Sequence, residues 1–253
     1  MCRLITPTGL NSIKLVLGNP KFLITGTQFY FYEKGYFGKI PLQSIFSIFE
    51  ENHEIGEEIN LQFLATDVEG VTLTELSLLS WIAKKIRPLT IFEFGTSDGR
   101  TTVNFALNTS DNCKIYTLDL PEDDRLLFHN QLKEKFGEKN FSIPFKKNVG
   151  KYFINHPMSD KIIQIFGDSR EVNYAQYFGK IDLIFIDANH DYECVKSDTQ
   201  NAFKMLSDKG TIVWHDYPNW DGVCKYIDEL FIGGLPLFRI QDTRLACYTQ
   251  FVS

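Results

Sequence analysis

One stretch near the middle of the 253-residue chain constrains its fold more than any other. Residues 89–94 form a short apolar run that favours a β-strand, Gly95 and Gly99 follow, and residues 103–107 have helical character. A buried strand, a glycine turn and a helix N-terminus, in that order, hold nucleotide-like ligands in doubly wound α/β folds. The two glycines let the backbone turn tightly and approach a ligand closely. The stretch therefore predicts an α/β sheet organised around this turn.

The charge of the turn distinguishes between nucleotide-like ligands. A dinucleotide site offers backbone N–H groups to a pyrophosphate and should avoid negative charge there. Here Glu93 ends the strand and Asp98 lies inside the loop, and both suit a ligand with an ammonium or sulfonium group. S-adenosylmethionine (SAM) is such a ligand, and its carboxylate would use Thr101 and the helix N-terminal amides. An ordinary strand–turn–helix connection remains the alternative for a single glycine loop.

The flanking sequence predicts the other elements of an α/β domain. Thr72 and Glu75 have capping-box spacing and precede an amphipathic helix that stops at residues 87–88. Further helices are expected at residues 128–136, 170–177, 192–206 and 221–231. Further strands are expected at residues 114–119, 162–169, 181–187 and 211–214, and a closing β-hairpin at residues 237–240 and 245–251.

The first 68 residues differ from the rest of the chain. Residues 21–40 are crowded with Phe, Tyr, Ile and Thr around two glycines, which predicts short strands in a hairpin. Residues 43–49 suggest a helical stripe or another strand, and the acidic residues 50–58 a solvated connection. We expect an N-terminal β-rich accessory region over residues 1–68, serving as a structural cap, a substrate lid or a dimer contact. A Rossmann-like doubly wound domain with a C-terminal antiparallel hairpin follows over residues 69–253.

Polar side chains follow several of the predicted strands. Asp119 lies roughly 20 residues beyond the glycine turn, where a carboxylate can accept both hydrogen bonds of a ribose diol. Its alternative role is a helix N-cap. Asp187 and His190 follow one buried strand, and His215 and Asp216 follow the next. Because α/β sheets bind ligands at the carboxyl ends of their strands, we expect these side chains to share one edge.

Four ordered pieces between about residues 71 and 251 resemble the class I SAM-dependent methyltransferases. They are residues 93–101, Asp119, residues 167–169, and residues 187–192 together with 215–217. The last pair is most similar to the subgroup with macrocin-type sugar O-methyltransferases and cephalosporin hydroxylase-like proteins. The resemblance implies that SAM is bound by the glycine turn and the neighbouring strand ends, with Asp168 and Ser169 beside the adenine or else capping the next helix. The implied cofactor-binding residues are Glu93, Gly95, Thr96, Ser97, Gly99, Thr101, Asp119, Asp168, Ser169 and Asp187.

The resemblance also implies O-methylation of a small hydroxyl-bearing acceptor. A neutral hydroxyl is a poor nucleophile, so the site needs a base, a metal ion or both. His190 is the candidate base because an unperturbed histidine titrates near pH ~6.5, and His215 is the competing base; each has a structural hydrogen-bonding role as its alternative. With Asp187 they form the candidate catalytic set.

A divalent metal ion is the second implication of the resemblance. The relatives hold such an ion with acids at the ends of the fourth and fifth strands, and Asp187 and Asp216 match two of these positions. Carboxylate oxygens suit Mg²⁺. Tyr217 stands where the relatives have Asn or Asp, so loop and helix capping remains the alternative role of the two acids.

Composition narrows the class of protein. A net charge of −6 argues against a nucleic-acid partner. The five cysteines are scattered without a C-x-x-C pair, which fits free thiols in a reducing compartment, and no apolar run is long enough to span a bilayer. We expect a cytoplasmic enzyme without a membrane partner, with homo-oligomerisation left open.

Two alternative functions remain. An NAD(P)-dependent oxidoreductase is disfavoured because Ser97 and Asp98 stand where the dinucleotide fingerprint needs glycine. A non-catalytic SAM-binding protein of the same fold is the other, since fold alone does not establish activity.

Overall fold

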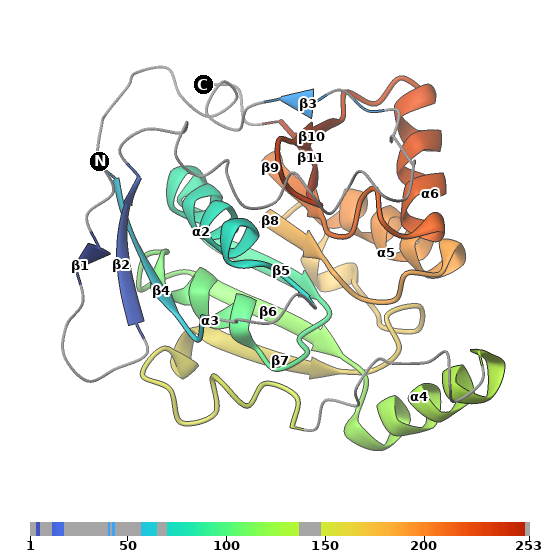
Figure 1. Ribbon diagram of the computed structural model, residues 1–253, viewed down its shortest axis with the longest axis horizontal. Coiled ribbons are helices and arrows are strands. Elements are labelled where there is room, and N and C mark those ends of the chain that lie inside the picture. The colour runs from blue at the N-terminus through green and yellow to red at the C-terminus, as the bar shows by residue number, and fades with distance from the viewer. Residues whose placement is uncertain are drawn as a thin grey trace.

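The strands form two sheets (Figure 1). The structure is a computed structural model, and it describes residues 4–5, 12–17, 40, 42–43, 57–64, 70–136 and 148–250. The large sheet has the strand order β3-β10-β11-β9-β8-β5-β6-β7, and the small sheet has the order β1-β2-β4. The small sheet contains β1 (Leu4–Ile5), β2 (Ser12–Leu17) and β4 (Glu57–Gln62). The strands of the large sheet are β3 (Leu42–Gln43), β5 (Thr90–Phe94), β6 (Lys114–Asp119), β7 (Ile162–Phe166), β8 (Ile181–Ile186), β9 (Leu206–Trp214), β10 (Phe238–Ile240) and β11 (Ala246–Thr249).

The centre of the large sheet is parallel and its C-terminal part is antiparallel. Strands β9, β8, β5, β6 and β7 run parallel, and β11 pairs antiparallel with both β9 and β10. From β5 the chain first adds β6 and β7 on one side, and it then returns to add β8 and β9 on the other. The predicted Rossmann-like sheet with a closing hairpin is thus confirmed. The change of direction between β5 and β8 is the kind of switch point where such sheets bind ligands.

Helices cover both faces of the large sheet. Those that pack in its two cores are α2 (Leu73–Ile86), α3 (Arg100–Leu107), α5 (Tyr192–Met205) and α6 (Asp221–Ile232). The chain also forms α4 (Glu122–Phe136) and the short 3₁₀ helices η2 (Ser159–Lys161) and η3 (Ala175–Tyr177). Successive residues of β8 alternate between two cores: Leu183 and Phe185 pack with α2 and α3, whereas Ile184 and Ile186 pack with α5 and α6. A parallel strand buried on both faces is apolar throughout, which is why this segment was so clear in the sequence.

The predicted capping box starts α2. The Oγ1 atom of Thr72 accepts a hydrogen bond from the Glu75 backbone at 3.3 Å, and the Glu75 carboxylate accepts one from the Thr72 backbone at 2.8 Å. The helix ends at Ile86 and is followed by Arg87 in the left-handed conformation and then by Pro88, which cannot continue a helix. These residues therefore fix where α2 ends and the chain turns towards β5.

The small sheet packs against the same helices. Ile59 and Leu61 of β4 are buried in one core with α2 and α3. The side chain of Asn108 on α3 forms two hydrogen bonds with the backbone of Asn60, at 2.8 and 2.7 Å, and Asn104 does the same with Gln62 at 2.9 and 3.0 Å. Side chains one helical turn apart thus satisfy the backbone of β4 along its free edge.

The N-terminal predictions are tested only in part. Apart from Ile40, the hairpin expected at residues 21–40 lies outside the described residues, as do residues 44–49. β3 extends the large sheet by pairing with β10, and Ile40 is buried in the core of that sheet. The acidic connection expected over residues 50–58 includes the start of β4, at Glu57. A boundary at residue 68 stays a prediction.

One predicted helix is wrong. Residues 170–174 form a turn followed by irregular backbone, and the short η3 follows at Ala175–Tyr177. The Asp168 carboxylate accepts hydrogen bonds from the backbone and side chain of Arg170, and Asn173 accepts one from the backbone of Ala175. Such local side-chain bonds offer the backbone an alternative to a helix.

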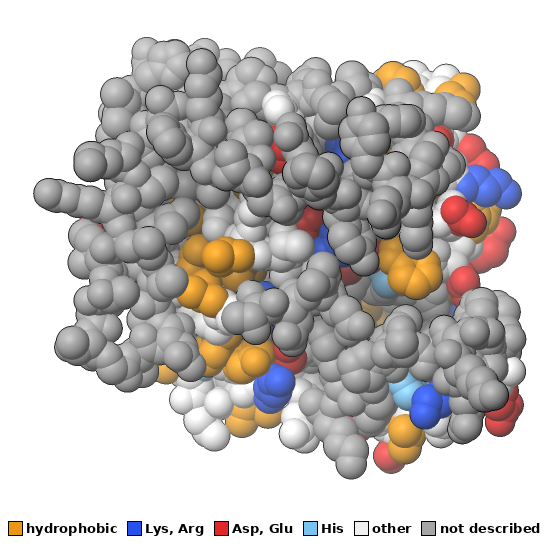
Figure 2. Space-filling view, viewed as in Figure 1, with side chains coloured by type: hydrophobic (Ala, Val, Ile, Leu, Met, Phe, Trp, Pro, Cys, Tyr) orange, Lys and Arg blue, Asp and Glu red, His pale blue; other side chains and the backbone are white. Residues whose placement is uncertain are grey.

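The molecular surface shows charges of both signs. Acidic and basic side chains are intermixed along the right-hand edge of Figure 2, where Figure 1 places α6, and Asp221, Lys225 and Glu229 of that helix are exposed. No helix among the described residues combines the length and the apolar character needed to cross a bilayer.

Candidate active site

The glycine turn joins β5 to α3 and packs directly against the end of β8. Gly95 has φ +95°, and a Cβ atom there would lie 2.0 Å from the carbonyl oxygen of Asp187. Gly99, with φ +82°, is the N-cap of α3, and a Cβ atom there would lie 2.6 Å from the ring of Phe153. Both glycines are therefore required by close approaches within the protein, and the first of these joins the turn to Asp187.

Asp119 lies beside the turn, as the sequence predicted. Its Oδ2 atom accepts a hydrogen bond from the Ser97 backbone at 2.7 Å, and its Oδ1 atom accepts one from the Leu120 backbone at 2.8 Å. Burial raises the pKa of this carboxyl, although Arg125 at 3.5 Å opposes the shift. Because each carboxylate oxygen accepts more than one hydrogen bond, a ribose diol could still bind here.

Glu93 is engaged inside the fold. Its carboxyl is buried and accepts hydrogen bonds from the hydroxyls of Thr102 at 2.5 Å and Thr117 at 2.6 Å. Thr96 is also buried and bonds to Thr117 at 2.7 Å. Burial raises the pKa of Glu93 to about 8. Contacts of Glu93 and Thr96 with a cofactor stay predictions, since these side chains already have partners within the sheet.

A further buried acid, Asp198 of α5, lies near the turn that follows β7. Asp168 is paired with Arg170, which lowers its pKa, and the Ser169 carbonyl accepts a hydrogen bond from Tyr174 at 2.7 Å. Burial raises the pKa of Asp198 to about 7, and an interaction with Ser169 opposes the shift. Asp198 escaped the sequence analysis because one acid in an amphipathic helix carries no motif.

An open groove of about 730 Å³ lies at the ends of β6 and β7. Its volume is typical of small-ligand sites. Two of its lining residues follow Asp119 closely and another directly precedes the turn at residues 167–169, but none of the predicted cofactor-binding side chains lines it. The lining consists of Pro121, Glu122, Asn148, Val149, Lys151, Ile154, Asn155 and Phe166.

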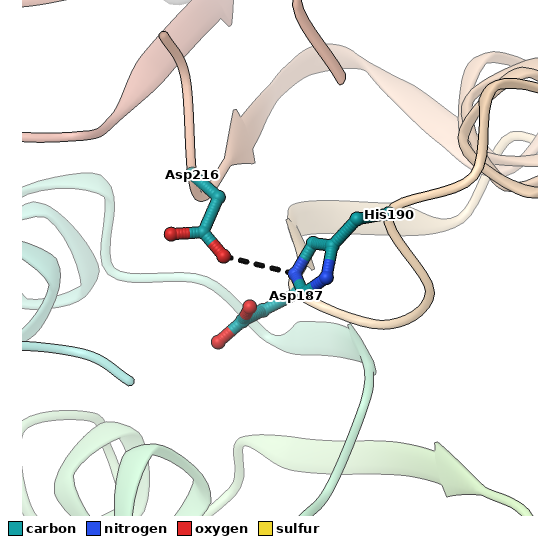
Figure 3. A group of neighbouring side chains, drawn as sticks. All are labelled: Asp187, His190 and Asp216. Atoms are coloured by element: carbon teal, nitrogen blue, oxygen red, sulfur yellow. Dashed lines mark ion pairs between the residues drawn. The ribbon is translucent and has the colours of Figure 1, made fainter. Parts of the chain in front are cut away.

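The ends of β8 and β9 bring Asp187, His190 and Asp216 together (Figure 3), and one ligand atom from each lies within 4.8 Å of the others. The Nε2 atom of His190 is 2.9 Å from Oδ2 of Asp216. This nitrogen is buried, yet it makes no well-directed hydrogen bond with any described residue. The His190 ring stacks on Trp220, with centroids 4.7 Å apart and planes 10° apart. The sequence predicted that these residues share an edge, and the structure confirms it.

His215 is surrounded by carboxylates. Its Nδ1 atom lies 3.1 Å from Asp187 and 3.4 Å from Asp216, and its Nε2 atom lies 3.2 Å from Glu75. Burial alone would lower the pKa of His215, but these three acids raise it well above the usual range. A histidine that keeps its proton and engages both ring nitrogens is poorly suited to accept a proton. The geometry therefore favours His190 over His215 as a base.

Two further residues of this cluster were not predicted as site residues. Besides its capping role, the Glu75 carboxylate accepts a hydrogen bond from the Arg244 backbone at 2.8 Å and two from the Arg244 guanidinium, at 3.0 and 3.2 Å. The same guanidinium bonds to Asp216 at 2.9 Å. His215 and Arg244 lower the pKa of Glu75 even though burial opposes the shift. The capping motif accounted for Glu75 locally, and nothing in the sequence of the hairpin indicated the position of Arg244.

Tyr217 points away from the cluster. It is fully buried, its hydroxyl donates to Asp228 at 2.7 Å, and it accepts a hydrogen bond from the Ile40 backbone at 3.3 Å. Tyr217 therefore serves the core, and His190 supplies the third potential ligand atom next to Asp187 and Asp216.

The strand-end cluster, which consists of Glu75, Asp187, His190, His215, Asp216 and Arg244, combines three carboxylates with two protein cations. One oxygen of Asp187 faces His215, one oxygen of Asp216 faces Arg244, and Oδ2 of Asp216 faces His190. The carboxylates of Glu75, Asp187 and Asp216 outnumber the cations His215 and Arg244 by one, so these five residues carry an excess of negative charge. The site therefore favours a cationic ligand, such as a sulfonium or a metal ion.

Comparison with known proteins agrees with this geometry. Residues 92–217 match the family model described as a methyltransferase domain, a span that starts in β5 and ends after β9. A search of curated proteins found no match. A Corynebacterium glutamicum protein of known structure aligns with a TM-score of 0.50 and 13% identity, over 73% of this chain and 83% of that chain.

Two further solved structures show the range of the similarity. An O-methyltransferase of Bacillus cereus, solved with SAH, aligns with a TM-score of 0.47 and 16% identity, over 72% of this chain and 84% of that chain. The O-methyltransferase TomG of Streptomyces achromogenes, solved with SAM, aligns with a TM-score of 0.46 and 13% identity, over 71% and 81% of the two chains. Residues 92–217, just under half of the chain, therefore match a methyltransferase domain, and they lie within a Rossmann-like sheet.

Proposed function

We propose that this protein transfers the methyl group of SAM to a hydroxyl oxygen of a small acceptor. One observation carries the proposal: Asp187, His190 and Asp216 meet at the ends of β8 and β9, and Gly95 packs directly on the backbone of Asp187. A cofactor at the glycine turn would thus lie beside groups that can activate a hydroxyl. The match to a methyltransferase domain supports methyl transfer over hydride transfer.

The chain offers a consistent set of cofactor contacts. Asp119 would bind the ribose, Asp168 and Ser169 would lie beside the adenine, and the glycine turn would line the amino-acid end. When bound, SAM supplies an electrophilic methyl group. S-adenosylhomocysteine (SAH) is the product that remains after the transfer. The net negative charge of the strand-end cluster would stabilise the sulfonium of SAM and not the neutral thioether of SAH.

His190 is the residue that we propose as the base. The acceptor oxygen forms its bond to the methyl carbon as it loses its proton, and the electrons of the broken S–C bond stay on sulfur. The Nδ1 atom of His190 would receive the acceptor proton, with Nε2 facing Asp216 at 2.9 Å. The Asp216 carboxylate would stabilise the resulting imidazolium, and Trp220 would hold the ring in place by stacking.

A divalent metal ion is the second way to activate the acceptor. Two carboxylates and one imidazole within 4.8 Å fit such an ion, and the buried Nε2 of His190 lacks a well-directed hydrogen bond to a described residue. Asp187, Asp216 and His190 would hold the ion, which when bound lowers the pKa of a hydroxyl ligand. A nitrogen ligand suits Mn²⁺, Fe²⁺ or Zn²⁺ better than Mg²⁺.

The test begins with the cofactor. Isothermal titration calorimetry of the full chain should show binding of SAM and SAH and no comparable binding of NAD⁺ or NADP⁺. Tight NAD⁺ binding without SAM binding would contradict the proposal. With SAM bound, a panel of catechols, sugars and other small hydroxyl compounds is then screened for SAH release; SAM binding with no transfer to any member would favour the non-catalytic alternative.

The metal question has its own readout. Mn²⁺ is titrated into the protein and free Mn²⁺ is followed by electron paramagnetic resonance. A metal site predicts saturable binding that weakens at least tenfold in Asp187→Asn and in His190→Ala, whereas the exposed control Asp191→Asn should bind as the wild type does. Absence of binding, with transfer retained in excess chelator, would eliminate the metal and leave His190 as the base.

A further inference from the structure

Arg100 is a buried cation at the glycine turn. It is the first residue of α3, directly after Gly99, and only 8% of its surface is exposed. Its Nη2 atom donates to the carbonyl of Val71, while Nη1 is buried and has no hydrogen-bond partner among the described residues. Among the residues that the structure describes, Arg100 takes part in no ion pair. A buried charge left in this state is unfavourable unless a ligand completes its hydrogen bonds.

The position of this guanidinium connects it to the site. Val71, which it contacts, follows Gly70, whose carbonyl accepts a hydrogen bond from Arg244. Arg244 in turn contacts Asp216 in the strand-end cluster. Two neighbouring backbone carbonyls before α2 therefore hold two guanidinium groups. Arg244 is paired with carboxylates, whereas Arg100 still has an N–H donor to offer.

The N-terminus of α3 is itself partly occupied. Its dipole favours an anion, but the backbone N–H of Arg100 already faces the Asp98 carboxylate at 3.3 Å. A ligand carboxylate at this helix end would therefore find the Arg100 amide already bonded to Asp98, and it would lie near the negative charge of Asp98. The Arg100 side chain supplies positive charge at the same helix end, and its planar fork matches a carboxylate in two hydrogen bonds.

We propose that Arg100 binds the carboxylate of the amino-acid end of the cofactor, and so selects SAM and SAH over adenosine ligands that lack this group. The inference rests on the proposed function, because it assumes that SAM occupies the glycine turn. In this proposal, Arg100 is the main contact of the carboxylate, in place of Thr101 and the backbone amides at the N-terminus of α3. Asp98, on the same turn, would complement the α-ammonium group of the same zwitterion.

The experiment compares three ligands by isothermal titration calorimetry. SAH carries the carboxylate and the ammonium, its decarboxylated analogue S-adenosyl-3-thiopropylamine carries only the ammonium, and 5′-methylthioadenosine carries neither. The wild type should bind SAH at least tenfold more tightly than the decarboxylated analogue, because a charge-assisted hydrogen bond is lost. Equal affinities would overturn the proposal, and this comparison needs no variant.

Arg100→Met then assigns the effect to the residue. SAH affinity should fall roughly 10- to 100-fold, and the affinities for the decarboxylated analogue and 5′-methylthioadenosine should stay within about threefold of wild type. Arg100→Lys should recover part of the SAH affinity. Arg87→Met, at an exposed arginine after α2, is the matched control and should bind all three ligands normally.

The outcomes separate the two proposals. A wild type that binds none of the three ligands contradicts the proposed function itself. SAH binding that survives Arg100→Met refutes only the role of Arg100. An equal loss for all three ligands assigns Arg100 to the support of the turn. If SAH is unaffected but a carboxylate-bearing methyl acceptor loses affinity, the carboxylate recognised belongs to the acceptor and not to the cofactor.

Discussion

Glu93 is the penultimate residue of the central strand β5, and its carboxyl is buried against the hydroxyls of Thr102 and Thr117. An acid at this position suggested a ligand contact in the sequence, and the structure shows the physical reason for a second role. The carboxyl joins β5, β6 and α3 beneath the glycine turn, since its partners lie on β6 and α3. Its pKa, raised to about 8 by burial and by the nearby charges of Asp187 and Asp119, keeps it protonated at neutral pH.

This shift predicts a pH dependence of stability. The pKa of Glu93 rises from 4.5 in the unfolded chain to about 8 in the fold, so the folded state binds the proton more tightly. The contribution of Glu93 to the free energy of unfolding is therefore fully present below pH 4.5 and is lost as the pH rises towards 8. Over this range the free energy of unfolding falls by up to about 1.4 kcal/mol per pH unit. Glu93→Gln removes the titrating group and keeps an oxygen for the two threonines.

Urea denaturation between pH 5 and 9 measures this effect. The free energy of unfolding of Glu93→Gln, relative to that of the wild type, should increase over this range. Asp198→Asn serves as a comparison, because burial raises the pKa of Asp198 to about 7 and its contribution is lost in an overlapping range. Parallel pH profiles for the wild type and Glu93→Gln would show that Glu93 is ionised in the fold.

At the scale of elements, the C-terminal hairpin does more than close the sheet. The turn between β10 and β11 carries Arg244 to the N-terminus of α2 and to the end of β9, where it contacts Glu75 and Asp216. One side chain thus connects three elements that are distant in sequence. The guanidinium also offsets the negative charge of two buried acids, which lets them lie close together at the site.

The Arg244–Glu75 pair should show strong coupling in a double-mutant cycle. Arg244→Met leaves Glu75, which is 1% exposed, without its guanidinium partner, and breaking such a pair typically costs about 3–5 kcal/mol of stability. Glu75→Gln alone should also destabilise, and the double variant should lose clearly less than the sum of the two. Urea denaturation of the four proteins gives the coupling energy.

An exposed pair provides the control. Arg170→Met removes an ion pair to Asp168 whose arginine side chain is 57% exposed, and such pairs contribute about 0–1 kcal/mol. Additive effects of Arg244→Met and Glu75→Gln would contradict the coupling, because residues in direct contact should not behave independently.

Local patterns account for which elements the sequence revealed. The capping box of α2 and the apolar run of β8 encode their structure over a few residues, and both were predicted close to their observed bounds. The segment at residues 170–177 failed because Asp168 and Asn173 bind nearby backbone groups and stop a helix from forming. β4 was missed because its partners, Asn104 and Asn108, lie on a helix more than forty residues away.

Across the sheet, the sequence predicts which acids share an edge but not how they are paired. Strand order follows from the α/β pattern, so Asp119, Asp187 and Asp216 were placed at one edge without knowledge of contacts. The enclosure of His215 by carboxylates, the part played by Arg244 and the inward turn of Tyr217 depend on tertiary packing. No periodicity in the sequence encodes these contacts.

In the proposed function, the end of β6 would bind the cofactor and the ends of β8 and β9 would activate the acceptor, and this division predicts independent effects. Asp119 ends β6 and Asp216 follows β9, with β5 and β8 between these strands. Three strand spacings place the two acids roughly 14 Å apart, beyond the range where substitutions usually couple. Asp119→Asn should therefore weaken SAM and SAH alike, roughly 10-fold or more, through the lost charge-assisted bond to the ribose.

Asp216→Asn should act on charge alone. It removes one negative charge from the strand-end cluster, so it should weaken the binding of cationic SAM and leave neutral SAH within about threefold of wild type. In the double variant, the two losses of SAM binding free energy should add to within about 0.5 kcal/mol. Calorimetry of both ligands with all four proteins tests this. If Asp216→Asn weakens SAH as strongly as SAM, Asp216 supports the shape of the cofactor site and not its charge.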